Sequence, residues 1–327
     1  MKYLITGGCG FIGSHLAETL VLSGKDVTII DDLSTGSIGN VENILNKSNL
    51  HLFIDTILNS ALLEELIKKS DFIFHLAAVV GVKRVMENPV DSLIINVEGT
   101  YNVLRYCAKY NKKIFLASTS EIYGKNENVP FKEEADIVIG TTKKRRWSYA
   151  CTKAIDEFLA FAFYEEKKLP VIVVRLFNTV GPRQSDRYGM VIPRFIKQAL
   201  NNLPITVFGD GQQTRCFIHV KDIIEGILKL ITKEEAYGDV FNMGSEEEIT
   251  IKDLALMIKN MTGSSSEVIF LNPQDIYSKG FEDMIKRVPD ISKIRNITGF
   301  SPKYNIKDII KDCIEDVKKA SEISKHI

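Results

Sequence analysis

The sequence has no excess charge of either sign and no long hydrophobic run. Its 327 residues contain 42 lysines and arginines against 42 aspartates and glutamates, so nothing marks a surface for nucleic acid or an anionic membrane. No apolar stretch approaches the ~20 residues of a membrane-spanning helix, and the N-terminus has no signal-peptide hydrophobic region. We therefore expect a cytoplasmic protein without nucleic-acid or membrane partners, in which local groups hold any anionic ligand.

Cysteine and histidine are scarce and scattered. The five cysteines include no C-x-x-C pair, and the five histidines form no H-x-x-x-H or mixed His/Cys cluster. An odd number of dispersed thiols in a chain of this length is typical of reduced cysteines and not of a disulfide framework. The sequence therefore predicts no disulfides and no metal site.

Short apolar runs alternate with helix-length amphipathic stretches through the first half of the chain. This alternation predicts βαβ units and a mainly parallel sheet covered on both faces. After about residue 177 the rhythm breaks, and prolines and glycines interrupt a looser region. We expect an α/β protein with a doubly wound, Rossmann-type sheet in residues 1–177. A smaller, interleaved substrate-binding part would occupy 178–327, with 217–245 returning to the sheet. The expected strands are Tyr3–Thr6, Asp26–Ile30, Leu50–Ile54, Asp71–His75, Lys113–Ala117 and Val171–Arg175, and the expected helices are Gly13–Leu22, Ala61–Lys69, Ser92–Tyr110, Tyr149–Lys167, Val191–Asn201, Val220–Ile231 and Ile251–Met261.

A glycine-rich loop follows the first predicted strand. Gly7, Gly10 and Gly13 have G-x-x-G-x-x-G spacing, and Phe11 and Ile12 lie between the last two. Such glycines allow a tight turn and a close backbone approach to a pyrophosphate, which then rests against the N-terminus of a helix. Glycines also occur in ordinary turns, so the loop indicates a dinucleotide site only in its strand–loop–helix context.

An acidic residue at the end of the second predicted strand supports that reading. Asp31 lies about 20 residues after the glycine loop, where a carboxylate binds the adenine ribose hydroxyls. A carboxylate there repels a 2′-phosphate, so NAD is favoured over NADP as the cofactor. Asp55, at the end of the third strand, is either an adenine contact or a residue of the turn before the next helix.

Tyr149 and Lys153 are four residues apart on a predicted helix, so their side chains share one face. A nearby ammonium lowers the pKa of a phenol, which can then take a proton from a sugar hydroxyl while the adjacent carbon gives hydride to NAD. Tyr164 and Lys168 have the same spacing, but they lie where the helix ends. We therefore predict Tyr149 as the base. Thr119, which follows the fifth strand, is predicted to hydrogen-bond the reacting hydroxyl. Alternatively, Thr119 caps a helix or turn.

With these residues in place, the chain resembles the extended short-chain dehydrogenase/reductase family, whose members are mostly sugar-nucleotide epimerases, dehydratases and decarboxylases. The resemblance implies NAD contacts at Leu76, Ala77, Ala78 and Asn96. It also implies a homodimer formed through a bundle of the helices 92–110 and 149–167. The stretches that carry it are Thr6–Gly13, Asp31, His75–Ala78, Asn96–Thr100, Ser118–Gly124, Tyr149/Lys153, Arg175–Arg183 and Phe208–Gly211 followed by Thr214-Arg215.

The resemblance also implies a substrate site and the class of reaction. Sugar-nucleotide contacts are expected at Asn178, Arg183, Val191 and Arg215, with Arg215 on the diphosphate. Family members begin by oxidising C4 of the sugar. Dehydratases carry Asp-Glu after the threonine, whereas this chain has Ser120-Glu121, so dehydration is disfavoured.

Ser120-Glu121 after Thr119 resembles the UDP-glucuronate decarboxylases. Three other stretches resemble the same enzymes: Arg146–Ala150, Ile276–Asp283 and Arg287–Asp290. Oxidation of C4 turns a glucuronate into a β-keto acid that loses CO2 readily. Arg287 and Glu121 would then handle the carboxylate and the proton, and Ser120 would bond the carboxylate. Alternatively, Arg287 forms a surface salt bridge or a diphosphate contact.

Two other functions stay open at this point. A sugar-nucleotide 4-epimerase or C4 dehydrogenase would keep the carbon count of its substrate. A binding protein that senses NAD without turnover would have no need of the Thr119, Tyr149 and Lys153 set. The basic run Lys143–Arg146, judged alone, is expected to be a solvated loop.

Overall fold

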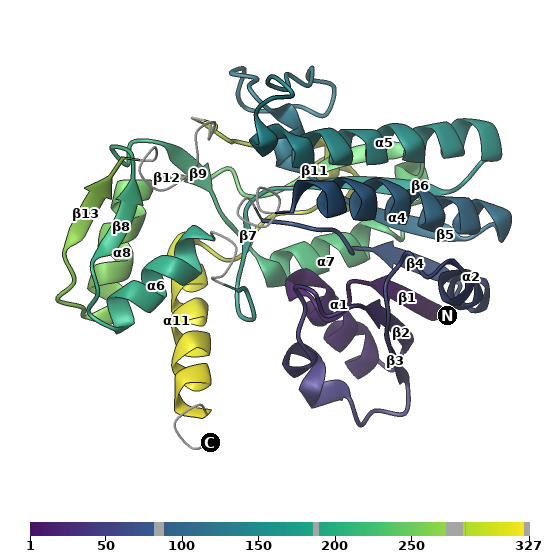
Figure 1. Ribbon diagram of the computed structural model, residues 1–327, viewed down its shortest axis with the longest axis horizontal. Coiled ribbons are helices and arrows are strands. Elements are labelled where there is room, and N and C mark those ends of the chain that lie inside the picture. The colour runs from purple at the N-terminus through teal and green to yellow at the C-terminus, as the bar shows by residue number, and fades with distance from the viewer. Residues whose placement is uncertain (82–87, 186–189, 273–283, 285, 324–327) are drawn as a thin grey trace.

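A parallel sheet of seven strands forms the larger part of the molecule (Figure 1). The computed structural model describes residues 1–81, 88–185, 190–272, 284 and 286–323. The strands run in the order β11-β6-β5-β4-β1-β2-β3, and every neighbouring pair is parallel. This confirms the predicted α/β Rossmann class. The strands are β1 (Lys2–Thr6), β2 (Asp26–Asp31), β3 (Leu50–Ile54), β4 (Phe72–His75), β5 (Lys113–Thr119), β6 (Val171–Leu176) and β11 (Asp239–Met243).

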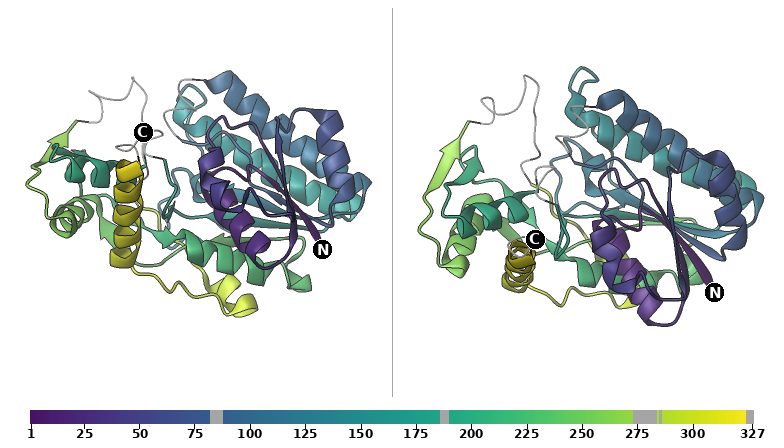
Figure 2. Two further views of the ribbon diagram at one scale, coloured as in Figure 1. Left: turned by 90° about the horizontal axis from the view of Figure 1, so that it is seen from below. Right: turned by 60° about the horizontal axis from the view of Figure 1, so that its bottom comes forward.

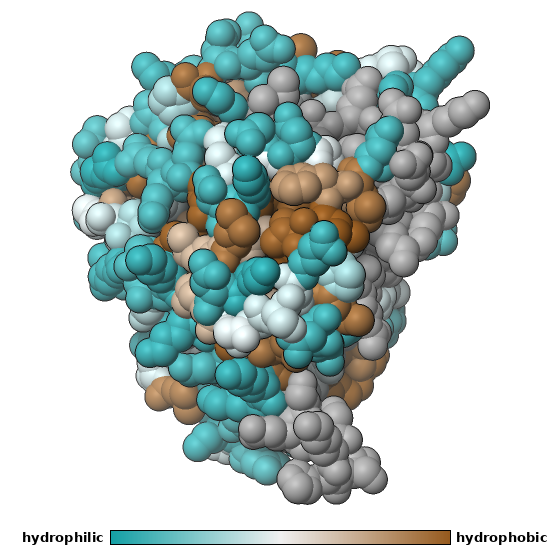
Figure 3. Space-filling model, turned by 90° about the vertical axis from the view of Figure 1, so that its left-hand side faces the viewer, coloured by the Kyte–Doolittle hydropathy of each residue, from teal (hydrophilic) through white to brown (hydrophobic). Residues whose placement is uncertain are grey.

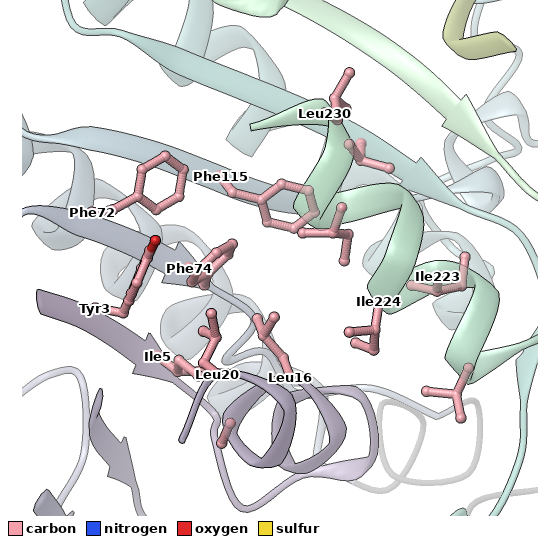
Figure 4. Close-up of a cluster of buried hydrophobic side chains, with 14 of the residues drawn as sticks. Tyr3, Ile5, Leu16, Leu20, Phe72, Phe74, Phe115, Ile223, Ile224 and Leu230 are labelled. Carbon is pink, nitrogen blue, oxygen red and sulfur yellow. The ribbon is translucent and has the colours of Figure 1, made fainter. Parts of the chain in front are cut away.

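Helices cover both faces of this sheet (Figures 1 and 2). Helices α1 (Phe11–Leu22) and α7 (Val220–Leu230) pack on one face, and α2 (Ser60–Lys69), α4 (Pro89–Lys109) and α5 (Ser148–Lys167) pack on the other. Successive strand side chains point to opposite faces. Tyr3 and Ile5 therefore join the core under α1 and α7, which Figure 4 shows, whereas Leu4 joins the core under α4 and α5.

The seventh strand comes from the second half of the chain. After α7 and the short helix η4 (Glu234–Ala236), β11 pairs with β6, and α10 (Ser292–Thr298) then packs beside α7 and β11. The chain therefore crosses from the sheet to the smaller part and back again. The predicted domain boundaries stay a prediction, but the interleaving of the two parts is visible in the strand order.

The smaller part has a core of its own beside the sheet. Helices α6 (Val191–Leu200), α8 (Ile251–Thr262) and α11 (Ile306–Ile323) surround the pair β8 (Ile205–Phe208) and β13 (Val268–Leu271). Two further pairs join it to the rest: β9 (Thr214–Cys216) with β12 (Glu248–Thr250), and β7 (Thr179–Val180) with β10 (Ile218–His219). Figure 3 shows its outer face as largely hydrophilic, with hydrophobic atoms gathered near the middle.

Candidate active site

A cavity of about 680 Å³ lies at the carboxyl edge of the sheet and extends to the smaller part. Ligands bind at this edge in open α/β sheets because the strand ends and the helix N-termini meet there. Among the described residues, Asn96, Ser120 and Arg183 are predicted site residues that do not line it. The predicted residues that do line it are Gly7, Gly10, Phe11, Ile12, Gly13, Asp31, Asp55, Leu76, Ala77, Ala78, Thr119, Glu121, Tyr149, Lys153, Asn178, Val191, Arg215 and Arg287.

The glycine loop between β1 and α1 fits a pyrophosphate. Gly7 has φ +73°, a conformation that favours glycine, and a Cβ on Gly13 would collide with the Gly7 carbonyl oxygen. Helix α1 begins at Phe11 without a side-chain cap and without an acidic residue in its first turn. Its first N–H groups and the positive end of its dipole are therefore available to phosphate oxygens.

The Asp31 carboxylate connects the end of β2 to this loop. Its Oδ2 accepts a hydrogen bond from the Cys9 N–H at 2.9 Å, and its Oδ1 accepts one from the Leu33 N–H at 2.8 Å. Burial raises the pKa of Asp31, while these two backbone donors oppose the rise. Each carboxylate oxygen has a further lone pair, so the group can still accept a bond from a ribose hydroxyl in the cavity.

Asp55 and Asn96 support the cofactor end in different ways. Asp55 lines the cavity, and its Oδ2 also accepts a bond at 2.7 Å from Asn59, the residue that caps α2. Asn96 lies behind the cavity wall. Its Oδ1 accepts a bond from the Val79 N–H at 2.7 Å and its Nδ2 donates to the Val79 carbonyl. Asn96 therefore fixes the segment after β4, which itself lines the cavity, and its direct cofactor contact stays a prediction.

Tyr149 is the second residue of α5, and Thr119 ends β5. The Thr119 hydroxyl hydrogen-bonds the Tyr149 phenol, and both side chains line the cavity. Burial raises the pKa of Tyr149, as do the carboxylates of Glu121 and Asp156, whereas Thr119 and Arg287 lower it. The phenol needs additional positive charge nearby in order to act as a base near neutral pH.

Lys153 lies one turn after Tyr149, but its ammonium is paired elsewhere. Its Nζ is 2.9 Å from Asp156 Oδ2, and neither side chain is more than 3% exposed. The Asp156 carboxylate therefore offsets part of the ammonium charge near Tyr149, and the lowering of the Tyr149 pKa by Lys153 stays a prediction. Nothing in the Tyr-x-x-x-Lys spacing indicated this partner.

Glu121 lies between two arginines at the substrate end of the cavity. Its Oε2 is 2.5 Å from Arg146 Nη1 and its Oε1 is 3.3 Å from Arg287 Nη2. Burial alone would raise the pKa of Glu121, but Arg146 and Arg287 outweigh burial and hold this pKa below its usual value. The side chain is therefore an anion near neutral pH.

Arg146 departs from the sequence prediction. It belongs to the basic run that was expected to be a solvated loop, yet its side chain is only 4% exposed and lines the cavity. It lies in the short helix η3 (Arg145–Trp147), directly before Tyr149. The Arg-Trp-x-Tyr stretch was the signal that could have placed Arg146 in the site.

The remaining predicted substrate residues divide into two groups. Asn178 lines the cavity, and its Oδ1 accepts a bond from Arg287 Nη1 at 2.9 Å; Val191 and Arg215 also line it. Arg183 instead forms an ion pair with Glu18 on α1. Ser120 is fully buried behind the wall, and its hydroxyl has no hydrogen-bond partner among the described residues. Direct substrate contacts predicted at Arg183 and Ser120 therefore disagree with this arrangement.

The competing pair lies away from the cavity. Tyr164 is 38% exposed and packs against Gly238, and Lys168 caps the C-terminus of α5. Neither lines the cavity described above. The predicted stretch 276–283 and the residues Val82 and Lys83 lie outside the described residues. Within the described ranges there is no cluster of His, Cys, Asp and Glu suited to a metal ion, and no helix long and apolar enough to cross a membrane.

The chain is similar to known proteins over almost its whole length. The family described as GDP-mannose 4,6 dehydratase matches residues 4–313. The chain belongs to the extended short-chain dehydrogenase/reductase family of sugar-nucleotide epimerases, dehydratases and decarboxylases. This confirms the family predicted from the sequence. The protein is thus an NAD-dependent enzyme that modifies a sugar nucleotide.

Relatives within the family include decarboxylases and epimerases. The UDP-N-acetyl-alpha-D-glucosaminuronate decarboxylase of Bacillus cytotoxicus is 41% identical over 315 residues, which are 96% of this chain and 97% of that protein. UDP-glucuronic acid decarboxylase 1 of Xenopus tropicalis is 34% identical over 98% of this chain and 73% of its own length. The UDP-glucuronic acid 4-epimerase of Bacillus cereus, in complex with UDP-glucuronic acid and NAD, has a TM-score of 0.88 at 30% identity and covers 98% of this chain and 100% of its own.

Proposed function

We propose that the protein oxidises C4 of a UDP-hexuronate and then decarboxylates the sugar. The observation that carries this proposal is the guanidinium pair of Arg146 and Arg287 around Glu121, in the cavity that also holds Tyr149 and Thr119. The two guanidinium groups place positive charge at the substrate end, beside the Glu121 carboxylate. Such a site suits a sugar that carries its own carboxylate.

The cofactor-binding residues of this chain fit NAD. The glycine loop would hold its pyrophosphate and Asp31 its adenine ribose. When bound, NAD supplies an acceptor for the hydride from C4 and a positively charged ring that favours the phenolate. Tyr149 then takes the proton of the C4 hydroxyl, and Thr119 holds that hydroxyl in line.

Loss of CO2 follows from the ketone that this oxidation leaves at C4. The C5–C6 bond breaks, its electron pair moves into an enolate through C5, C4 and O4, and the enolate then takes a proton at C5. Arg146 and Arg287 orient the carboxylate before it leaves. Glu121, an anion near neutral pH, is a poor proton donor in the resting site. We propose that Glu121 neutralises part of the guanidinium charge of the two arginines. The site then does not bind the carboxylate of the substrate so tightly that loss of CO2 is hindered.

Two uronates are candidates for the substrate. UDP-glucuronate is the one predicted from Thr119-Ser120-Glu121 and Arg287. The 41% identity to a UDP-N-acetylglucosaminuronate decarboxylase favours the sugar with a 2-acetamido group. Both carry the carboxylate at C6 that the arginine pair requires, so the proposal concerns a UDP-hexuronate in either case.

The test is to incubate the purified protein with NAD and each uronate, and to follow CO2 release together with the product mass. We expect CO2 from at least one of them, together with either a 4-keto UDP-pentose and NADH or, where NADH returns its hydride to C4, a UDP-pentose. UDP-glucose serves as the matched substrate without a carboxylate. Turnover of a uronate with no change in carbon count would contradict decarboxylation and support 4-epimerisation.

The 4-epimerase is the second candidate because the UDP-glucuronic acid 4-epimerase structure covers 98% of this chain. Glu121 weighs against epimerisation. Its arginine-bound side chain has a role where the carboxylate of the sugar leaves as CO2, whereas epimerisation keeps the carboxylate of the sugar in place. A sensor that binds NAD without turnover is disfavoured because Tyr149 and Thr119 are hydrogen-bonded within the cavity as a catalytic pair.

The protein is further proposed to be a homodimer formed through α4 and α5. Apolar side chains with helical spacing are exposed on both helices, with Val90 65% exposed on α4 and Phe158 69% exposed on α5. The two helices pack along each other on one face of the sheet (Figure 1). The same pair from a second copy would bury these stripes in a four-helix bundle. The other exposed apolar residues on these helices are Leu93, Ile94, Tyr101, Ile155 and Tyr164.

A further inference from the structure

A buried acid lies directly behind the catalytic pair. Asp156 on α5 has no exposed surface, and its Oδ2 is 2.9 Å from Lys153 Nζ. The Thr100 hydroxyl of α4 also bonds this carboxylate, and the same hydroxyl lies 3.1 Å from His75 Nε2. His75 in turn lies 2.8 Å from the Thr6 hydroxyl at the end of β1. A chain of polar contacts therefore runs from the strand before the glycine loop to the catalytic lysine.

The charge of Asp156 is the unusual feature of this chain of contacts. A carboxylate buried between packed helices is retained at a cost in desolvation: burial raises the pKa of Asp156, and Lys153 and Thr100 oppose only part of that rise. Its negative charge also opposes ionisation of Tyr149. Asp156 thus opposes the lowering of the Tyr149 pKa that is expected from Lys153.

We propose that Asp156 is a positioning residue that holds the Lys153 ammonium between α4 and α5 and, as a fixed negative charge, sets the pH at which Tyr149 becomes a base. The inference rests on the C4-oxidation step of the proposed function and not on the fate of the carboxylate.

Other charged groups near the pair do not substitute for Asp156. The buried His75 has its pKa lowered to about 3 by burial and by Lys153, so it is neutral at the pH of catalysis. Glu157 is engaged by Arg175 at 2.8 Å. Glu121 faces Tyr149 from the substrate end, where Arg146 and Arg287 bind it.

The experiment compares Asp156→Asn with Asp156→Glu in the NAD-bound protein. Ionisation of Tyr149 is read from the near-ultraviolet absorbance of its phenolate, as the difference between each protein and the same protein carrying Tyr149→Phe. This readout needs no substrate, so it is independent of which sugar nucleotide is turned over. We expect Asp156→Asn to move the midpoint to lower pH by on the order of one unit, because the opposing charge is gone. Asp156→Glu should leave the midpoint near that of the parent protein.

Three further measurements complete the test. The acid limb of the activity profile should shift in the same direction as the phenolate midpoint. Glu165 is an exposed carboxylate on the same helix, and Glu165→Gln should change neither the phenolate midpoint nor the acid limb of the activity profile. Asp156→Ser is prepared alongside, because its smaller side chain leaves room for a water beside Lys153 if Asp156→Asn does not fold. A purely structural ion pair predicts lower stability and a uniform loss of activity with an unchanged midpoint, and that result overturns the proposal.

Discussion

Arg146 Nη1 lies 2.5 Å from Glu121 Oε2, and this contact joins Glu121, two residues after Thr119, to the short helix η3 that precedes Tyr149. Removing the guanidinium leaves Glu121 with Arg287 alone, at 3.3 Å. We expect Arg146→Gln to lower kcat/KM for the uronate by about tenfold to a hundredfold, the effect of losing a hydrogen bond to a charged group. Steady-state kinetics measure this.

The same variant should change the pH dependence in a defined direction. Arg146 lowers the pKa of Glu121, so its loss raises that pKa, and activity that needs the anion is lost at a higher pH as the solution is acidified. Arg145→Gln is the matched control, one residue earlier and exposed. Equal effects of the two substitutions would show that Arg146 has no special part in the site.

Tyr149→Phe should reduce the rate of C4 oxidation by about 10²- to 10⁴-fold, because the proton of the sugar hydroxyl then has no base to accept it. The readout is NADH absorbance in a single turnover. Tyr164→Phe, on the same helix but outside the cavity, should retain the parent rate. Retention of activity by Tyr149→Phe would instead favour a different base.

Asp31→Asn should weaken NAD binding by about tenfold and reduce the preference for NAD over NADP. An amide has one acceptor oxygen, so only one of the Cys9 and Leu33 N–H groups can be satisfied, and the repulsion of a 2′-phosphate is lost. Titration of both cofactors by fluorescence measures the two affinities. Asp26→Asn, at the other end of β2, should leave both unchanged, and an unaltered ratio for Asp31→Asn would contradict the proposed ribose contact.

His75 should make the fold less stable in acid. Burial lowers its folded pKa to about 3 from the ordinary histidine value of 6.5, so the unfolded chain binds a proton between these values and the folded protein does not. The contribution of neutral His75 to the free energy of unfolding is fully present above about pH 6.5. It is lost as the pH falls towards about 3, with a slope of up to about 1.4 kcal/mol per pH unit. Chemical unfolding across this range measures it.

His75→Gln should be less stable near neutral pH, because one of the two buried hydrogen bonds is lost. Its free energy of unfolding should nevertheless fall less steeply with acid than that of the parent protein. His51→Gln, on the surface of β3, is the control and should keep the parent slope. Equal slopes for all three proteins would show that His75 does not carry the effect.

Phe158→Glu should convert the proposed dimer into a monomer, because a charge in an apolar helix bundle has no partner there. Sedimentation velocity distinguishes the two states. Leu22→Glu on α1, where the leucine is 62% exposed, should not change the mass. A parent protein that sediments as a monomer would dismiss the helix-bundle dimer directly.

The sequence was sufficient for the features that depend on local spacing. The six predicted strands match observed ones to within about two residues, since their apolar runs are bounded by turn residues and most of them are buried on both faces; in β3 only Leu50 is buried. The glycine loop and Asp31 followed from their places after β1 and at the end of β2. The seventh strand and the short strand pairs of the smaller part were not specified as elements, because they lie after residue 177, where prolines and glycines break the alternation of strands and helices that supported the other six.

What only the tertiary structure decided is which charges meet. No spacing rule places Glu121 between Arg146 and Arg287, residues 25 and 166 positions away, or turns Lys153 towards Asp156. Arg183 and Asn96 have positions in the sequence that suit ligand contacts, yet their side chains point to α1 and to the segment after β4. Strand order and helix formation follow from local pattern and burial. The direction and protonation of a buried polar side chain depend on partners that only the folded chain brings together.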